Sequence, residues 1–421
     1  MTAQQLQSCV SGAIKENLEN METKEYRLKQ VTEKITKGTT PSNIGESFTE
    51  EGIMYFRSEL IGKSKYIDKS DGLLFISNET HEKLKRSQIQ KNDLLFSMAG
   101  IYLGKISLVG DEDFPANTNQ AVAIIRFNSK EIDLEYVYYY MTQRWYNIYI
   151  NSLTAQAAQP NINLDQIGNL KLNLPPLPTQ QKIASILSAY DNLIQNYKKQ
   201  IEALQTAASE LYKEWFVRFR FPGWQNAKFE NGIPEGWKVE KLFDVAKIIY
   251  GYPFNSDEFC DDSTLNPVVR IRDILDNHTD TYTSEPCDEK YWINPNEMLI
   301  GMDGIFHMTL WTGERALQNQ RTVRVSSKTK NLSNYYLYFS LYPQIKALEQ
   351  MIVGTTVAHL GDKHLKKITI LVPAEKILKM SYEKLEPMMN RIYSLQQQIT
   401  NLTQQRDLLL PRLMSGKLEV K

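Results

Sequence analysis

Apolar residues recur every three or four positions along two long stretches of the chain, one in the middle and one at the C-terminal end. From Thr179 to Arg218 this spacing runs without a glycine or proline. It predicts a single helix of about 40 residues, roughly 60 Å long at ~1.5 Å per residue. Thr179 is well placed as its N-cap, and Pro222 with Gly223 ends it.

The C-terminal stretch predicts a second long helix that begins near Glu375 and is broken by Pro411. Pro387 lies in its early part and predicts a kink or a late restart there, because proline has no N–H to donate. Each helix carries an apolar seam of the coiled-coil type. We therefore expect the two helices to pack on each other, antiparallel, as a spine; the alternative is that each packs on its own domain. The seam residues are Ile183, Tyr190, Tyr197, Leu204, Leu211, Trp215, Ile392, Leu395, Ile399, Leu402, Leu409 and Leu413.

Short apolar stretches broken by glycines precede each long helix, a pattern typical of a compact, β-rich α+β domain. Residues Ala121 to Phe127 predict a buried strand, and Glu135 to Tyr149 predict a helix. Residues 1–24 predict a polar helical lead-in.

The chain repeats itself about 200 residues apart. Five blocks recur in the same order, so chance similarity is a poor explanation and the pattern indicates a tandem duplication of a domain. Three of the matched pairs are Met98-Ala99-Gly100 with Met302-Asp303-Gly304, Asn119-Gln120 with Asn319-Gln320, and Leu170–Pro175 with Ile368–Pro373.

The 421 residues suffice for two to three domains, and 42% hydrophobic with 23% charged residues is ordinary for a soluble protein. No apolar run approaches the ~20 residues of a membrane span, and the N-terminus is too polar for a signal peptide, so we expect a cytoplasmic protein without a membrane partner. Cys9, Cys260 and Cys287 are too few and unpatterned for a disulfide framework or a zinc site. The formal net charge of zero means that nucleic-acid binding needs local basic patches.

Motifs for catalysis are incomplete in this sequence. The segment Asn173–Leu177 lacks the aromatic residue of an amino-methyltransferase loop. Gly100–Lys105 resembles a phosphate-binding loop but is one residue short and has no Ser/Thr after the lysine, so it predicts a turn between strands. Asp288-Glu289-Lys290 is more typical of a solvated turn than of a nuclease centre. The sequence predicts no catalytic residue and no metal site.

The order of these parts resembles the specificity subunit of type I restriction-modification systems. The resemblance extends from about Tyr26 to Lys421 and is carried by the duplication together with three segments, Leu174–Ala184, Trp215–Phe219 and Leu409–Leu418. Two features depart from the family pattern. Gln180 stands where an acidic residue is usual, and the second connector keeps only Pro373 of its prolines.

The resemblance implies an α+β fold with two repeated target-recognition domains separated by a spine of two long antiparallel coiled-coil helices. It divides the chain into an N-terminal helical lead-in (1–25), a first DNA target-recognition domain (26–175), the central long helix that the family conserves (176–222), a second target-recognition domain (234–374) and the C-terminal helix (375–421). It also implies a non-catalytic subunit in which each domain reads one half of a bipartite, asymmetric DNA target and the spine sets the spacer.

Family resemblance further implies a complex with double-stranded DNA, two methyltransferase subunits and restriction-translocase subunits. The spine and its ends, Trp215–Arg220 and Leu410–Leu418, are the expected docking surfaces. S-adenosylmethionine, Mg²⁺ and ATP belong to the partner subunits, so this chain needs no cofactor. Two alternatives stay open: a coiled-coil adaptor without nucleic-acid binding, and the recognition subunit of a system with a methyltransferase but no nuclease.

Recognition of a DNA sequence needs side chains that form hydrogen bonds with base edges, and lysine and arginine side chains that bind phosphates. Basic candidates follow a predicted strand in the first copy and lie on one in the second. Amide or hydroxyl candidates lie in two loops at matching places, just before the final strand of each copy. They are Arg57, Lys63, Lys65, Gln156, Gln159 and Asn161 in the first copy, and Arg270, Arg272, Thr355, Thr356 and His359 in the second.

The two loops differ completely in sequence, which fits two different half-sites, although any one of these residues is also typical of an ordinary exposed surface. The repeated Asn-Gln pairs are better explained by the fold than by recognition. The clustered tyrosines at 136–140 and 335–338 favour helix packing over base stacking.

Overall fold

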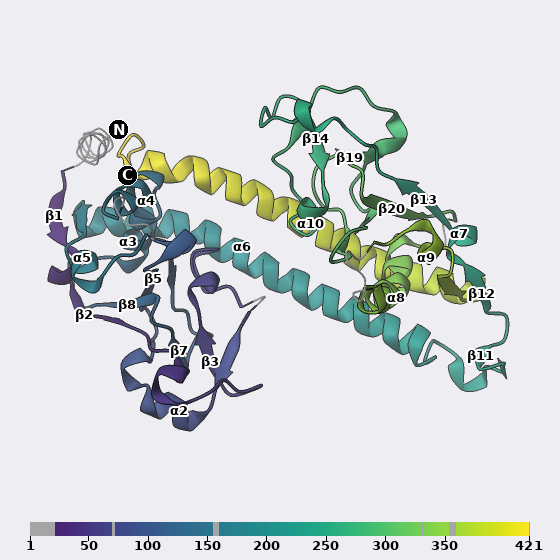
Figure 1. The fold of residues 1–421 in the computed structure, drawn as a ribbon, viewed down its shortest axis with the longest axis horizontal. Coiled ribbons are helices and arrows are strands. Elements are labelled where there is room, and N and C mark those ends of the chain that lie inside the picture. The colour runs from purple at the N-terminus through teal and green to yellow at the C-terminus, as the bar shows by residue number, and fades with distance from the viewer. Residues whose placement is uncertain (1–21, 70–71, 155–159, 330–331, 353–358, 421) are drawn as a thin grey trace. The chain divides into compact units, whose positions relative to one another are not determined.

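The computed structural model describes residues 22–69, 72–154, 160–329, 332–352 and 359–420, so the predicted helix at 1–24 lies almost entirely outside the described residues (Figure 1). The chain divides into two compact units. The first unit comprises residues 1–193 and 402–421, and the second comprises residues 194–401. Each unit includes part of both long helices, α6 (Leu177–Tyr212) and α10 (Glu375–Met414).

An antiparallel four-stranded sheet forms the centre of the first unit. Its strands are, in sheet order, β2 (Thr32–Lys37), β8 (Val122–Phe127), β5 (Leu94–Ser97) and β6 (Ile106–Leu108). The predicted strand at Ala121–Phe127 is confirmed as β8. Its first four residues, three of them β-branched, are buried between strand neighbours on both sides, an environment in which branched side chains pack well.

Two smaller sheets complete the first unit. In one, the central strand pairs antiparallel on one side and parallel on the other; its strands are β4 (Leu74–Ile76), β3 (Ile53–Phe56) and β7 (Ala116–Thr118). The other consists of β1 (Lys24–Arg27) and β9 (Lys171–Leu174). Among the described residues of this unit, the α-helices besides α6 and α10 are α2 (Asn78–Lys83), α3 (Leu134–Met141), α4 (Arg144–Ser152) and α5 (Leu164–Gly168).

The second unit repeats this plan. Its four-stranded antiparallel sheet has the equivalent order β13 (Ala246–Tyr250), β20 (Thr322–Ser327), β17 (Met298–Gly301) and β18 (Met308–Leu310). A parallel pair again joins β14 (Asn266–Val269) to β19 (Ala316–Gln318), flanked by β15 (Tyr282–Thr283) and β16 (Trp292–Ile293). The duplication in the sequence is therefore a duplication of strand order.

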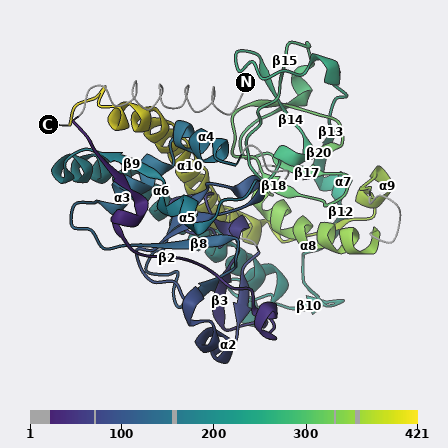
Figure 2. The same ribbon diagram turned by 60° about the vertical axis from the view of Figure 1, so that its left-hand side comes forward.

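The remaining elements of the second unit surround its sheets. The strands are β12 (Lys238–Lys241), paired with β21 (Thr369–Val372), and β10 (Phe229–Glu230), paired with β11 (Ile233–Pro234). The helices are α7 (Leu242–Val245), α8 (Asn334–Ile352) and α9 (Asp362–Leu365). Helix α8 lies along the four-stranded sheet, contacting β20 and β18 (Figure 2).

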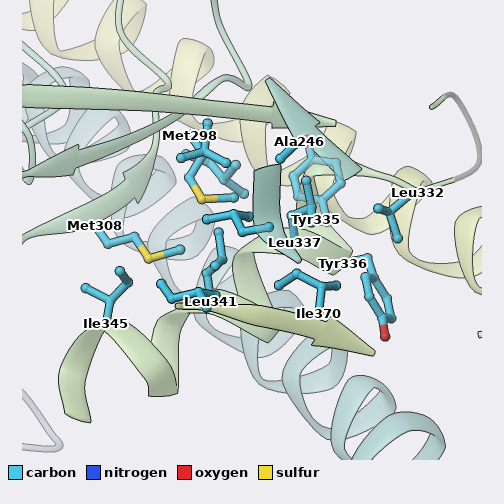
Figure 3. Close-up of a cluster of buried hydrophobic side chains, with 14 of the residues drawn as sticks. Ala246, Met298, Met308, Leu332, Tyr335, Tyr336, Leu337, Leu341, Ile345 and Ile370 are labelled. Atoms are coloured by element: carbon cyan, nitrogen blue, oxygen red, sulfur yellow. The ribbon is translucent and has the colours of Figure 1, made fainter. Parts of the chain in front are cut away.

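The core of the second unit fills the space between this sheet and helix α8. Met298 and Met308 from the sheet lie near Leu337 and Leu341 of the helix, and Tyr336 lies beside Ile370 (Figure 3). The tyrosine clusters are core residues, as predicted: Tyr136, Tyr139 and Tyr140 of the first unit are at most 2% exposed, and Tyr335 and Tyr336 at most 3%. Burial raises the pKa of the partly covered Tyr338 to about 12.

The predicted helix at Glu135–Tyr149 is wrong as a single element. Helix α3 ends at Met141 and α4 begins at Arg144, with Thr142 and Gln143 between them. The apolar spacing continues across the break, which is why the sequence pattern did not reveal it. In the second unit the equivalent region is one helix, α8, which continues through Pro343.

The ends of the long helices differ from the prediction. The N–H groups of Thr179 and Gln180 donate to the carbonyl of Pro176, so α6 begins at Leu177 and Thr179 is not its cap. Pro178 lies in the first turn, where proline is tolerated because its missing N–H has no helical acceptor. At its other end α6 becomes a π-helical turn at Lys213–Val217.

Helix α10 is continuous through both of its prolines. The predicted late restart near Pro387 is wrong, and the helix runs past Pro411 to Met414. Pro387 is exposed between Leu385 and Met389, which are both buried. Packing of the seam on both sides of the proline stabilises the helix there in spite of one lost hydrogen bond.

The two long helices pack together in each unit, as predicted. In the first unit the start of α6 and the end of α10 share a core, and in the second unit the end of α6 and the start of α10 share another. The helices are thus antiparallel, and each also packs on the sheets and helices of its unit. Of the predicted seam residues, Ile183, Ile392, Leu395, Ile399 and Leu413 are buried, and Tyr190, Tyr197, Leu204, Leu211, Trp215, Leu402 and Leu409 are partly buried.

Gln180, the departure from the family pattern, holds the start of α6. It is 1% exposed. Its amide nitrogen donates to the carbonyls of Glu131 (3.1 Å) and Pro175 (2.8 Å), and its amide oxygen accepts from the Asp133 N–H (3.0 Å). A carboxylate here lacks the two N–H donors, so glutamine suits these partners.

Candidate nucleic-acid interface

Arg57 and Arg270 occupy equivalent places in the two units. Each follows the strand that forms the parallel pair, β3 or β14, and each precedes a short 3₁₀ turn. The prediction that Arg270 and Arg272 lie on a strand is wrong, because β14 ends at Val269. The main chain turns there as the Arg270 N–H donates to the Asp273 carboxylate at 2.9 Å.

Both guanidinium groups are only partly engaged. The Arg57 side chain is 37% exposed with its Nη1 3.7 Å from Glu59 Oε1, and the Arg270 side chain is 25% exposed with its Nη2 bonded to the Thr281 hydroxyl. The Nε atoms of both arginines are buried without a hydrogen-bond partner. The buried Nε atoms cannot reach a ligand, so the remaining donors of each arginine are on its Nη groups, of which Arg57 Nη2 also donates to the Gly72 carbonyl at 3.5 Å.

The other basic candidates differ sharply in exposure. Lys65 is 2% exposed, and its ammonium lies 2.5 Å from Glu135 Oε1 and 3.1 Å from the Ser188 hydroxyl of α6. This ion pair holds the buried Lys65 ammonium inside the first unit, although Glu135 itself is 38% exposed, so we exclude Lys65 from the interface. Lys63 is 46% exposed and lies 3.5 Å from Asp68. Arg272 is 72% exposed, 3.5 Å from Asp273.

Of the two predicted loops, Gln156, Gln159, Thr355 and Thr356 lie outside the described residues. The described ends of the loops are Asn161 and His359, which are exposed and occupy equivalent places. Asn161 forms a β-bridge with Ala99, and His359 forms the same bridge with Asp303. The structure thus brings each loop end to the turn that follows the Met-x-Gly block.

The two units have the same backbone bridge at this place but different side chains around it. In the second unit the Asp303 carboxylate contacts His359 Nδ1 at 2.6 Å and Arg321 Nη1 at 3.1 Å, and Arg321 is 60% exposed. In the first unit the equivalent positions are the uncharged Ala99, Asn161 and Ala121. Sequence reasoning missed Asp303 and Arg321. One clue was available: the Asn-Gln pair is the same in both copies, but the residue after it is Ala121 in the first copy and Arg321 in the second.

A hollow of about 560 Å³ lies beside the bridge in the first unit. It is lined by Lys37 and by four amide side chains, which offer both donors and acceptors as base edges do. The amides are Gln120, Asn161, Asn163 and Gln166.

The repeated Asn-Gln pairs support the fold, as expected. A Cβ atom added to Gly38 would lie 2.0 Å from the Thr118 carbonyl oxygen, and one added to Gly251 would lie 1.9 Å from the Asn319 carbonyl oxygen. Glycine is required at both places because two backbone segments approach closely. The Asn-Gln turns form one side of this contact in each unit.

The structure shows where the segment that resembles a phosphate-binding loop lies. Gly100–Lys105 is the turn between the antiparallel strands β5 and β6, as predicted. Among the described residues, no cluster of three or more His, Cys, Asp or Glu side chains has a geometry that could hold a metal ion. Within that same part of the chain, no helix is both long and apolar enough to cross a membrane.

A family model of the type I restriction modification DNA specificity domain matches residues 20–206 and 234–404. The chain belongs to this family. The two matched segments correspond to the two copies of the repeat, each with part of its long helix.

Named relatives agree with this family over most of the chain. The type I restriction enzyme MjaIX specificity subunit of Methanocaldococcus jannaschii is 25% identical over 417 residues, covering 94% of each chain. The EcoBI specificity subunit of Escherichia coli is 30% identical over 180 residues, covering 43% of this chain and 38% of the relative. The crystal structure of a type I restriction-modification S subunit from M. genitalium has the same fold, with a TM-score of 0.58 at 14% identity, covering 94% of this chain and 96% of that one.

The chain is thus a specificity subunit of a type I restriction-modification system, the non-catalytic component that serves DNA recognition. The fold predicted from the resemblance, two recognition regions with two long helices packed together, is confirmed. In this family the cofactors belong to the methyltransferase and restriction subunits.

Proposed function

We propose that each unit reads one half of a bipartite, asymmetric DNA target. The observation that carries this proposal is that equivalent positions around one backbone bridge differ in chemistry: Asn161 replaces His359, and two alanines replace Asp303 and Arg321. A scaffold repeated with unlike side chains at one place suits two unlike base sequences.

The exposed groups suit distinct contacts. An asparagine such as Asn161 can bond the N6 and N7 atoms of adenine, and an arginine held by a carboxylate, as Arg321 is by Asp303, can bond O6 and N7 of guanine. Arg57 and Arg270 are alike at equivalent positions, so we assign them to phosphates, which every half-site shares. Lys63 and Arg272 are further phosphate candidates, and the loop residues Gln156, Gln159, Thr355, Thr356 and His359 are base-reading candidates.

We place the recognition domains at residues 26–175 and 234–374, with the long helices setting the spacer between half-sites. Helix α6 begins in the first unit and ends in the second, and its 36 residues extend over about 54 Å at ~1.5 Å per residue. A helix is much stiffer than a flexible linker, and this stiffness supports the assignment.

We propose that two methyltransferase subunits dock on the helices and their ends, Trp215–Arg220 and Leu410–Leu418. Exposed apolar side chains at these places support this assignment: Val217 is 60% exposed, Leu408 71% and Leu193 39%. Burial of such residues against a partner is favourable. Restriction-translocase subunits then join the same complex, and S-adenosylmethionine, Mg²⁺ and ATP bind to the partners.

The test is an exchange of residues 236–374 for the equivalent segment of a relative with a different target. Methylation is mapped in cells that contain the methyltransferase subunit of the same system. We expect the second half of the methylated motif to change while the first half and the spacer stay the same. An unchanged motif would refute the proposal. A control exchange of the same residues for those of a relative with the same target should leave both halves as they were.

A further inference from the structure

One isoleucine stands exposed at the same place in each unit. Ile101 is 85% exposed in the turn between β5 and β6, and Ile305 is 57% exposed in the turn between β17 and β18. We call residues 98–105 the first tip turn and residues 302–307 the second tip turn. Apolar side chains exposed singly are common on proteins, so exposure alone decides nothing.

The backbone holds both isoleucines in the same way. Met98 N–H donates to the Ala121 carbonyl at 2.8 Å, and the Met98 carbonyl accepts from Ile162 at 2.9 Å. In the second tip turn Met302 makes the equivalent bonds, to the Arg321 carbonyl at 2.9 Å and from Leu360 at 2.7 Å.

The next turn residues direct the chain outward. Gly100 has φ +67° and Gly304 has φ +68°, and a Cβ atom added to either would meet nothing within 4 Å. After the isoleucines the chain returns to the core, at Leu103 in the first tip turn and at Phe306 in the second, which are 3% and 0% exposed. Both isoleucines therefore project from well-fixed turns, and their exposure is not a result of fraying.

Both units expose an isoleucine at this place, so accidental exposure is a poor explanation. The neighbours on the same bridges have diverged, from alanine to Asp303, from alanine to Arg321 and from asparagine to His359. The isoleucine is the same in both units, although neither its side chain nor the preceding glycine is packed inside. An isoleucine that is the same in both units, among neighbours that differ, suits a ligand that presents the same surface to both units.

Duplex DNA is the ligand that the surroundings favour. Each tip turn is bridged to Asn161 or His359, the residues that end the proposed base-reading loops. Cationic groups accompany both isoleucines. The exposed Lys105 shares the first tip turn, with its ammonium over the Tyr102 ring at 5.1 Å, and the exposed Arg321 lies at the second. Cations bind phosphates of any sequence, and apolar side chains pack against sugars and base edges in the groove.

We propose that Ile101 and Ile305 are paired apolar contacts to DNA that do not depend on sequence, one at each half-site, and that they seat the bridged residues Asn161 and His359 of their unit in the groove. The proposal rests on the proposed function, since it takes the loop ends to face DNA. The isoleucines, which are the same in both units, would contact the DNA surface that both half-sites share. The bridge residues that differ between the units would contact the bases that differ between the half-sites.

The experiment uses the full chain assembled with the methyltransferase subunits of its own system. Ile101→Ala, Ile305→Ala and the double variant are titrated with a duplex that carries the mapped methylation motif and with an unrelated duplex of equal length. We expect each single change to weaken binding about tenfold on both duplexes, and the double change to weaken it about a hundredfold, as loss of buried apolar surface dictates. Leu275→Ala and Val239→Ala are matched controls, because these residues are 56% and 58% exposed outside the tip turns.

Three outcomes overturn the inference. Binding that is unchanged on both duplexes shows that the isoleucines do not contact DNA. Weakening on the motif duplex alone makes them base-reading residues. Loss of the methyltransferase subunits from the purified complex makes the tip turns a protein docking surface. Failure of the proposed function itself looks different, because the wild-type complex then shows no preference for the motif duplex.

Discussion

Removing the cation from a buried pair in the first unit should destabilise this unit strongly. Arg406 of α10 lies with its Nη1 2.5 Å from the Asp191 carboxylate of α6, and the Asp191 side chain is only 5% exposed. The same carboxylate accepts the Tyr139 hydroxyl of α3. Asp191 therefore joins both long helices to the recognition region of this unit. In the Arg406→Met variant the Asp191 carboxylate stays buried and keeps the Tyr139 hydroxyl as a donor.

Breaking a buried pair by removing one partner costs about 3–5 kcal/mol. The Arg406 side chain is 25% exposed and Tyr139 still donates, so we expect a loss at or just below the lower end of this range, about 2–4 kcal/mol. The second unit offers the matched control. There the equivalent helix positions hold Met389 and Ala208, both buried in one apolar cluster. The triple variant Asp191→Met, Arg406→Ala and Tyr139→Phe copies this apolar arrangement and should recover most of the loss.

Urea unfolding of the full chain, followed by circular dichroism, measures both variants. A loss of under about 0.5 kcal/mol in Arg406→Met, the size of an ordinary surface substitution, would refute the reasoning. So would a triple variant no more stable than the single one, because the loss would then come from packing and not from the unpaired charge.

Three further predictions concern single residues. Lys65→Met should lower the free energy of unfolding by about 1–2 kcal/mol, because Glu135 loses its cation but stays 38% exposed and keeps the Ser188 hydroxyl, with Lys63→Met within about 0.5 kcal/mol as the exposed control; equal effects in urea titrations would contradict this. Gly251→Ala should cost at least about 2 kcal/mol in thermal unfolding because its Cβ meets the Asn319 carbonyl, whereas Gly361→Ala, with no neighbour nearer than 3.6 Å, should be nearly neutral; the reverse order would refute the close approach. Arg321→Ala should relax one position in the second half of the methylation motif by about 1–3 kcal/mol of discrimination and leave the first half intact, and relaxation in the first half instead would exclude a role for Arg321 in its own unit.

Periodic features of this fold were predictable from the sequence because they depend on neighbouring residues. The seam from Ile183 onward identified α6, and the branched run at 122–125 identified β8. Errors arose where a distant contact decides the outcome. Pro387 does not interrupt α10, because the seam packs on both sides of it, and Thr179 does not cap α6, because the Pro176 carbonyl accepts its N–H.

The candidate site was less predictable for the same reason. Lys65 resembled any loop lysine until the fold placed Glu135 and Ser188 around its ammonium. Arg321, Asp303 and His359 are far apart in the sequence and meet only because the turn after β17 crosses the chain before α9. Spacing along a chain carries no information on such a meeting, whereas comparison of the two copies identified the places where the side chains diverge.

Mapping DNA methylation in otherwise identical cells with and without this chain tests the central claim most directly. The account predicts that the chain adds one motif composed of two different short sequences separated by a spacer of unspecified bases. A motif that is continuous, a motif with two identical halves, or no difference between the two cell lines would contradict it.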